Sequence, residues 1–185
     1  MSVKILVPLA EGFEETEAVA VIDVLRRAGL DVTTAGLAPG LVRGAHAIAL
    51  APDASLDELD LSTFTAVVLP GGLPGARALA ADERVLGLVR RLHAEGRTTA
   101  AICAAPLVLR AAGVLGAAPI TSHPSVRAEL EGTALRDEPR VIVSGSVVTS
   151  QGPGTALEFA LVLVGLLAGP ERARELQRAM LVRSD

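Results

Sequence analysis

Short apolar runs separated by helical patterns are the feature that most constrains the fold of this chain of 185 residues. The runs have the length and β-branched content of strands buried on both faces, and they lie at Val3–Ala10, Asp31–Ala35, Ala66–Pro70 and Thr98–Ile102. Helical patterns over Glu14–Ala28 and Asp82–Ala94 lie between them, each followed by a glycine typical of a helix end. Strands that alternate with helices predict βαβ units, and therefore an α/β fold with a mostly parallel sheet and helices on both faces.

The second half of the chain continues this pattern less regularly. We expect a helix over Pro106–Ala112, a strand at Ile120, strands over Val141–Val143 and Val147–Thr149, and helices over Phe159–Ala168 and Glu171–Met180. Thr155 and Glu158 have the spacing of a capping box that opens the first of these last two helices. Because no repeat, low-complexity tract or linker interrupts the chain, we expect residues 1–185 to form a single domain.

Composition excludes several classes of function. With three Phe, no Tyr and no Trp, the chain lacks surfaces on which single-stranded nucleic acid could stack, and a formal net charge of -4 disfavours nucleic acid further. Its single cysteine excludes an intrachain disulfide framework, and with three scattered histidines we expect no metal site. Acidic residues follow the first apolar run at once, unlike a signal peptide, and proline and glycine interrupt the apolar segment Thr98–Thr121. We therefore expect a cytoplasmic protein without a membrane segment.

Cys103 is the first candidate for chemistry. It ends a predicted strand and precedes a predicted helix that has Pro106 in its first turn. Such a turn lifts a side chain above the carboxyl edge of a parallel sheet, where open α/β sheets place their sites. The free N–H groups and the dipole of the helix N-terminus would favour the thiolate over the thiol. The alternative is an inert cysteine that packs as a small apolar residue.

A nucleophilic thiolate also needs hydrogen-bond donors for an oxyanion and a proton carrier. The turn Gly71-Gly72 follows a buried strand, so the N–H groups of Gly72 and Ala104 could face one carbonyl oxygen above the sheet. The alternative is a loop that merely turns. Glu17 heads an otherwise apolar helical stripe, which predicts an inward-facing carboxyl group with a raised pKa that could carry protons.

The histidines and the late glycine-rich segment give weaker signals. His123 follows a short predicted strand and precedes Pro124, which places it on the same edge of the sheet as Cys103, although a structural histidine fits the same pattern. His46 alternates with apolar neighbours and is ambiguous. The segment Gln151–Thr155 lacks the spacing of either nucleotide-binding fingerprint, so we interpret it as a tight connection.

Seven segments, in order along the chain, form a set that is recognisable together. They are Glu11–Glu17, Asp23–Gly29, Pro52–Ser55, Val67–Gly72, Ala100–Pro106, Thr121–Pro124 and Thr149–Thr155. This set resembles the parkinsonism-associated deglycase and glyoxalase III group of the DJ-one/PfpI family, within the class I glutamine amidotransferase-like superfamily. The resemblance runs to Leu181-Val182 without a large insertion.

The resemblance implies a flavodoxin-like three-layer sandwich that is usually a homodimer and needs no cofactor. It implies that Cys103 is the nucleophile or an oxidation-sensitive thiol, that Glu17 hydrogen-bonds the sulfur and that His123 is the nearby histidine. Gly72 and Ala104 match the backbone donors. The residues that we expect in the substrate pocket or near the dimer contact are Glu14, Gly71, His46 and Arg27.

Members of this family are described as cofactor-independent glyoxalase III enzymes that convert methylglyoxal to lactate, as protein or nucleotide deglycases, and as redox-responsive chaperones. Our leading hypothesis is such an enzyme, acting on 2-oxoaldehydes or their early glycation adducts, with nucleic acid only as a glycated substrate. The alternative is a redox-sensing chaperone whose oxidisable cysteine performs no dedicated catalysis. A third hypothesis is a relative that kept the fold without the activity.

Departures from the family pattern narrow the activity. His46 stands where close relatives carry an arginine thought to line an anion pocket, so pH-independent anion binding is in doubt. Ala104 stands where the protease-like branch has its histidine base, which disfavours peptidase activity. No histidine follows His123, whereas the related amidotransferases place a His-x-Glu pair late in the chain, which disfavours amidotransfer.

Overall fold

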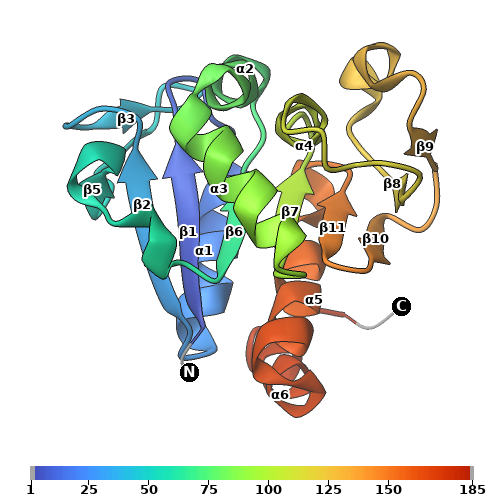
Figure 1. Ribbon diagram of the computed structural model, residues 1–185. Coiled ribbons are helices and arrows are strands. Elements are labelled where there is room, and N and C mark those ends of the chain that lie inside the picture. Colours follow the sequence, from blue (N-terminus) through green and yellow to red (C-terminus); the bar gives the residue numbers. More distant parts are fainter. Residues whose placement is uncertain (1–2, 184–185) are drawn as a thin grey trace.

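A seven-stranded sheet forms the centre of the computed structural model, which describes residues 3–183 (Figure 1). Across the sheet the strands are β10 (Val141–Ser144), β11 (Val147–Ser150), β7 (Thr99–Ile102), β6 (Ala66–Leu69), β1 (Lys4–Leu9), β2 (Asp31–Gly36) and β5 (Ala54–Ser55). The β10–β11 hairpin is antiparallel and every other pair of neighbours in this sheet is parallel. The carboxyl ends of β1, β6, β7 and β11 therefore meet at one edge.

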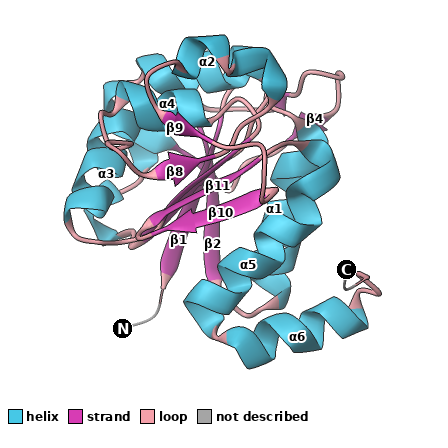
Figure 2. Cartoon of the chain, turned by 90° about the vertical axis from the view of Figure 1, so that its right-hand side faces the viewer, coloured by secondary structure: helices cyan, strands magenta, loops and turns pink. Residues whose placement is uncertain are grey.

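Helices cover both faces of this sheet (Figures 1 and 2). On one face lie α1 (Glu15–Arg27) and α5 (Ala156–Ala168), with α6 (Pro170–Ala179) packed against α5, and on the other lie α2 (Leu73–Ala81), α3 (Glu83–Ala94) and α4 (Pro106–Ala111). This arrangement confirms the predicted α/β fold of three layers. Within residues 3–183, no helix has both the length and the apolar character that a membrane span requires.

Smaller elements flank the central sheet. An antiparallel hairpin joins β3 (Val42–Arg43) and β4 (Ala49–Leu50), and a parallel pair joins β8 (Pro119–Ile120) and β9 (Ala134–Leu135). Single turns of 3-10 helix lie at Leu56–Glu58, Leu61–Thr63, Pro124–Val126, Ala128–Leu130 and Pro153–Thr155. Strands of two residues carry no periodicity, and the sequence did not predict the β3–β4 hairpin, β5 or β9.

Burial explains why the longer elements form where the sequence predicted them. Ile5, Leu6 and Val7 in β1 are all inaccessible to solvent, as expected of a strand covered by helices on both faces. The inward stripe of α1 is buried through Val21 and Val24, and both residues join the single hydrophobic cluster that runs through the molecule.

Two local expectations were wrong or incomplete. Thr155 does not cap α5, because its hydroxyl is bonded to Ser150 and Gly152 instead, and the helix begins at Ala156. Glu158, the other half of the predicted capping box, forms an ion pair with Arg140. Helix α2 was not predicted, because Gly71-Gly72 was interpreted only as a turn after the strand.

Candidate active site

Cys103 lies between β7 and α4 and adopts a backbone conformation that residues with a side chain rarely adopt. Its φ of +63° lies in the left-handed region. Hydrogen bonds hold both of its backbone groups: its N–H donates to the Ser150 carbonyl (2.9 Å) and its carbonyl accepts from the His123 N–H (2.9 Å). Such strain persists only where the surroundings enforce it, and it is common at functional sites. The turn leaves Cys103 9% exposed at the carboxyl edge of the sheet.

Glu17, from the first turn of α1, is completely buried beside this thiol. Its Oε2 accepts a hydrogen bond from the Gly71 N–H at 2.8 Å, whereas Oε1 is buried without a hydrogen bond of normal geometry. Burial raises the pKa of Glu17 to about 7, assisted by the charge of Glu14 and opposed by the interactions with Cys103 and Gly71. The carboxyl group is therefore present in both protonation states near neutral pH, as sequence analysis expected.

Two glycines make this close approach possible. A Cβ atom on Gly71 would lie 2.5 Å from Glu17 Oε2 and 2.6 Å from Cys103 Cβ, so a side chain there would force the acid and the thiol apart. Gly72 has a φ of +85°, and a Cβ on it would collide with the Gly12 carbonyl. Because neither residue has a side chain, the segment that follows β6 can run between α1 and Cys103.

The protonation of Cys103 departs from the sequence-based expectation. The N–H groups of Gly72 and Ala104, expected to face a carbonyl oxygen, interact with the sulfur in the free protein and lower its pKa. Burial, followed by the charge of Glu17, outweighs them and raises the pKa of Cys103 to about 12. The dipole argument alone was therefore wrong, because it ignored the burial of the sulfur and the charge of Glu17 beside it. Protonation of Glu17 removes that repulsion but not the effect of burial, and because the two groups interact they titrate as a coupled pair.

His123 reaches the same edge by way of its backbone. It caps the 3-10 turn Pro124–Val126, and its Nδ1 accepts the Ser125 N–H (3.2 Å) and lies 2.8 Å from Ser125 Oγ. Since Nδ1 accepts a backbone N–H, the neutral ring carries its proton on Nε2. The hydrogen bonds of the imidazole go to Ser125, and it is the His123 backbone that contacts Cys103.

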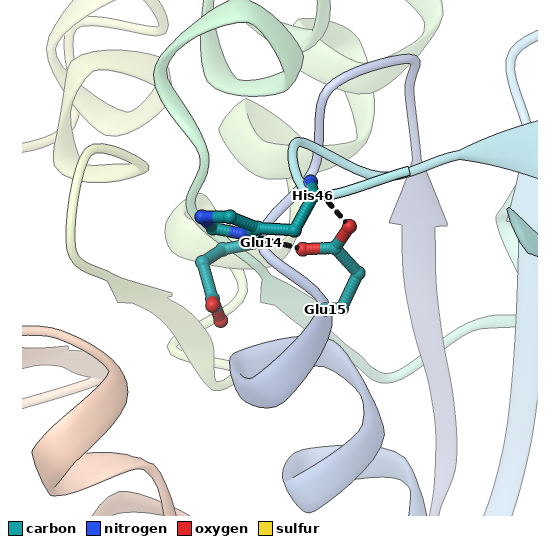
Figure 3. A group of neighbouring side chains, drawn as sticks. All are labelled: Glu14, Glu15 and His46. Carbon is teal, nitrogen blue, oxygen red and sulfur yellow. Dashed lines mark hydrogen bonds and ion pairs between the residues drawn. The ribbon is translucent and has the colours of Figure 1, made fainter. Parts of the chain in front are cut away.

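Next to Glu17 along α1, Glu14 and Glu15 form a second cluster with His46 (Figure 3). Glu14 caps α1, with its Oε2 accepting the Glu17 N–H at 2.7 Å. Glu15 is buried and accepts the His46 N–H (2.6 Å) and pairs with His46 Nδ1 (2.9 Å). Burial acts to raise the Glu15 pKa, but these hydrogen bonds prevail and lower it to about 2, and the same pair raises the His46 pKa.

Sequence reasoning did not single out Glu15. Its partner His46 is 31 residues away on the loop between β3 and β4, so no local spacing connects the two. Gly44 was the available signal, because a Cβ there would collide with the Glu15 side chain. Ligand atoms of Glu14, Glu15 and His46 lie within 4.8 Å of one another, but both Glu15 oxygens are already hydrogen-bonded. The cluster holds the loop to the start of α1.

The structure does not bring Arg27 to Cys103 within one chain. Arg27 ends α1 and pairs with Asp23 at 2.6 Å, ten residues after Glu17 and therefore about 15 Å along the helix axis. Any contribution of Arg27 to the site would have to come from a second copy of the chain.

Comparisons with known proteins identify the family of the chain. Residues 3–166 match the model of the DJ-1/PfpI family. The chain is 43% identical to Protein dj-1beta of Drosophila melanogaster over 98% of both chains, and the crystal structure of that protein superposes with a TM-score of 0.95 over 100% of both chains at 42% identity. It is 38% identical to the glutathione-independent glyoxalase DJR-1.2 of Caenorhabditis elegans, over 97% of this chain and 95% of the relative. With this extent of similarity, the chain belongs to the DJ-1/PfpI family.

Proposed function

We propose that this chain is a cofactor-independent glyoxalase III-type enzyme, with deglycase activity on early glycation adducts, that acts on methylglyoxal and other 2-oxoaldehydes through Cys103. The observation that carries the proposal is the buried Glu17 carboxyl, with a pKa of about 7, against the Cys103 thiol. An acid that exchanges its proton near neutral pH beside a nucleophile provides what isomerisation of a 2-oxoaldehyde needs. A relative named as a glutathione-independent glyoxalase supports the same class of reaction.

The first step is addition of sulfur to the aldehyde carbon. When Glu17 holds the proton of the pair, Cys103 is the thiolate and attacks C1 of methylglyoxal to form a hemithioacetal. The N–H groups of Gly72 and Ala104, which interact with the sulfur in the free protein, would donate to the new alkoxide.

Proton transfer between two carbons follows. Once Glu17 has protonated the alkoxide, its carboxylate removes the proton from C1, giving an enediolate with its negative charge on the C2 oxygen. Glu17 then returns this proton to C2, and the proton of the C1 hydroxyl passes to the C2 oxygen. C1 is oxidised to a thioester and C2 is reduced to a carbinol, so the substrate supplies both halves of the redox change. Water then hydrolyses the lactoyl thioester, which releases lactate and restores the thiol.

His123 would assist as a hydrogen-bond donor in this scheme. Because its Nδ1 accepts from Ser125, the neutral ring offers Nε2–H and not a lone pair to an oxygen of the substrate. Glu17 is then the group that carries the proton between the two carbons.

We also propose that the chain works as a homodimer in the cytoplasm. Val19 on α1 and Ile48 on the adjacent loop are 46% and 57% exposed, and a groove of about 280 Å³ on this side is lined by Val19, Ile22 and Leu50. A second copy would cover these apolar groups. Light scattering of the wild type and of Val19→Asp tests the dimer: two equal masses would contradict this surface.

The cytoplasmic location rests on a separate observation. The single free thiol, Cys103, fits a reducing compartment.

The enzymatic proposal is tested with methylglyoxal consumption. Wild type should form lactate, whereas Cys103→Ser and Glu17→Ala should lose at least about a hundredfold in kcat, because one lacks the nucleophile and the other the proton carrier. Glu131→Gln, which changes an exposed carboxylate, is the matched control and should retain wild-type activity. Equal rates for wild type and both site variants would remove the mechanism.

A further inference from the structure

The last two residues of β11 both reach the candidate active site. Ser150 accepts the Cys103 N–H through its backbone carbonyl, as described above. Thr149 acts through its side chain: its Oγ1 accepts the Thr121 backbone N–H at 2.9 Å. Thr149 and Thr121 are both inaccessible to solvent, so water cannot replace this hydrogen bond.

Thr121 opens the segment that ends in His123. Strand β8 ends one residue earlier, at Ile120, so Thr121 is outside its ladder to β9. The Thr121 N–H is fastened to the Thr149 hydroxyl, and the His123 N–H, two residues on, is fastened to the Cys103 carbonyl. In an extended segment, N–H groups two residues apart point the same way, so the two bonds form one row that clamps residues 121–123 against β11 and the Cys103 turn.

Resting on the proposed function, we propose that Thr149 is a positioning residue for the reaction, whose hydroxyl holds His123 and the Cys103 backbone in their working arrangement. Without this acceptor the Thr121 N–H would be buried and unsatisfied unless the segment moved. Movement of the segment displaces the His123 imidazole and weakens the bond that the His123 N–H donates to Cys103. Thr149 touches neither the sulfur nor the imidazole in the bonds described, so it acts through these two residues.

The chain offers a matched control for this hydroxyl. Thr99 lies in β7, the strand that leads to Cys103, and is also inaccessible to solvent, but its Oγ1 makes no hydrogen bond. Thr99→Val and Thr149→Val therefore remove the same group from the same sheet, and only the second removes an acceptor. Thr149→Ser keeps the hydroxyl and removes only the methyl group.

The experiment measures kcat and KM for methylglyoxal, and hydrogen exchange of the Thr121 and His123 amides, in wild type and these three variants. In Thr149→Val we expect kcat to fall at least about tenfold with KM within about twofold, and both amides to exchange at least about tenfold faster. Thr149→Ser and Thr99→Val should stay within about twofold of wild type.

Wild-type kcat in Thr149→Val would overturn the proposal, and so would an equal loss in Thr99→Val, since any buried threonine would then have the same effect. If wild type does not consume methylglyoxal, the proposed function fails. Faster exchange of both amides in Thr149→Val would then still support the clamp, and unchanged exchange would overturn it.

Discussion

Replacing Glu17 with glutamine should make the protein more stable and less active, and the gain in stability should depend on pH. Glutamine keeps the shape of the side chain and an oxygen that can accept the Gly71 N–H, but it cannot ionise or carry a proton. We expect kcat for methylglyoxal to fall at least about a hundredfold.

The structure sets the size of the stability gain. Burial raises the Glu17 pKa from 4.5 to about 7, which at about 1.4 kcal/mol for each pH unit makes ionised Glu17 cost about 3 kcal/mol in the folded state. Well below pH 4.5 the carboxyl is protonated in both the folded and the unfolded state, so this cost is absent. Wild type loses stability as the pH rises through 4.5 to about 7. The advantage of Glu17→Gln should be under about 1 kcal/mol at pH 5 and about 3 kcal/mol at pH 8.

Urea unfolding at pH 5 and pH 8 measures both values, with Glu131→Gln as the control for loss of an exposed carboxylate. The control should change stability by less than about 0.5 kcal/mol at either pH. If the free energy of unfolding of Glu17→Gln relative to wild type is the same at both pH values, Glu17 ionises in the folded protein as freely as in the unfolded chain, and the reasoning behind the proton carrier is refuted.

Three further predictions concern the surroundings of the thiol. Glu15→Gln should destabilise the protein by about 2 kcal/mol at pH 7. Because the Glu15 pKa is lowered to about 2, this difference in stability should shrink as the pH falls from 4.5 towards 2, which acid unfolding can measure. Gly71→Ala should lower the free energy of unfolding by about 1–3 kcal/mol and remove most of the activity. Gly87→Ala in α3, where a Cβ meets no atom within 4 Å, should instead stabilise the protein by about 0.5–1 kcal/mol, and thermal unfolding distinguishes the two variants. After mild peroxide treatment, peptide mass mapping should find Cys103 as the sulfinic acid in wild type but as the sulfonic acid in Glu17→Ala, because a protonated Glu17 can donate a hydrogen bond to the sulfinate. The same product in both proteins would exclude this role of Glu17.

Periodicity predicted the parts of the site that belong to long elements. The burial of Glu17 follows from its place in the apolar stripe of α1, and the position of Cys103 follows from a buried strand that runs into a helix. Both arguments use residues close in sequence. The location of the site at the carboxyl edge of the sheet was predicted from the parallel strands, since their carboxyl ends meet on one side of a sheet.

The sequence could not predict features that depend on contacts between distant segments. The bond between Glu15 and His46 and the bond between Thr149 and Thr121 each join a helix or strand to a loop about thirty residues away. The high pKa of Cys103 depends first on burial of the sulfur and then on the charge of Glu17, and both depend on how separate elements pack around the thiol. Thr155 shows the converse, because tertiary partners took its hydroxyl away from the helix end that its spacing favoured.

Glu17, Gly71 and Cys103 follow β1, β6 and β7, which are consecutive in the middle of the sheet. A slip of one residue between any two of these strands would separate the acid from the sulfur, whereas fraying of β5 or β10 at the margins would leave them together. During refolding, Cys103 should therefore become buried beside Glu17 only when the central strands have reached their native alignment. The reactivity of this thiol would then report correct assembly of the sheet.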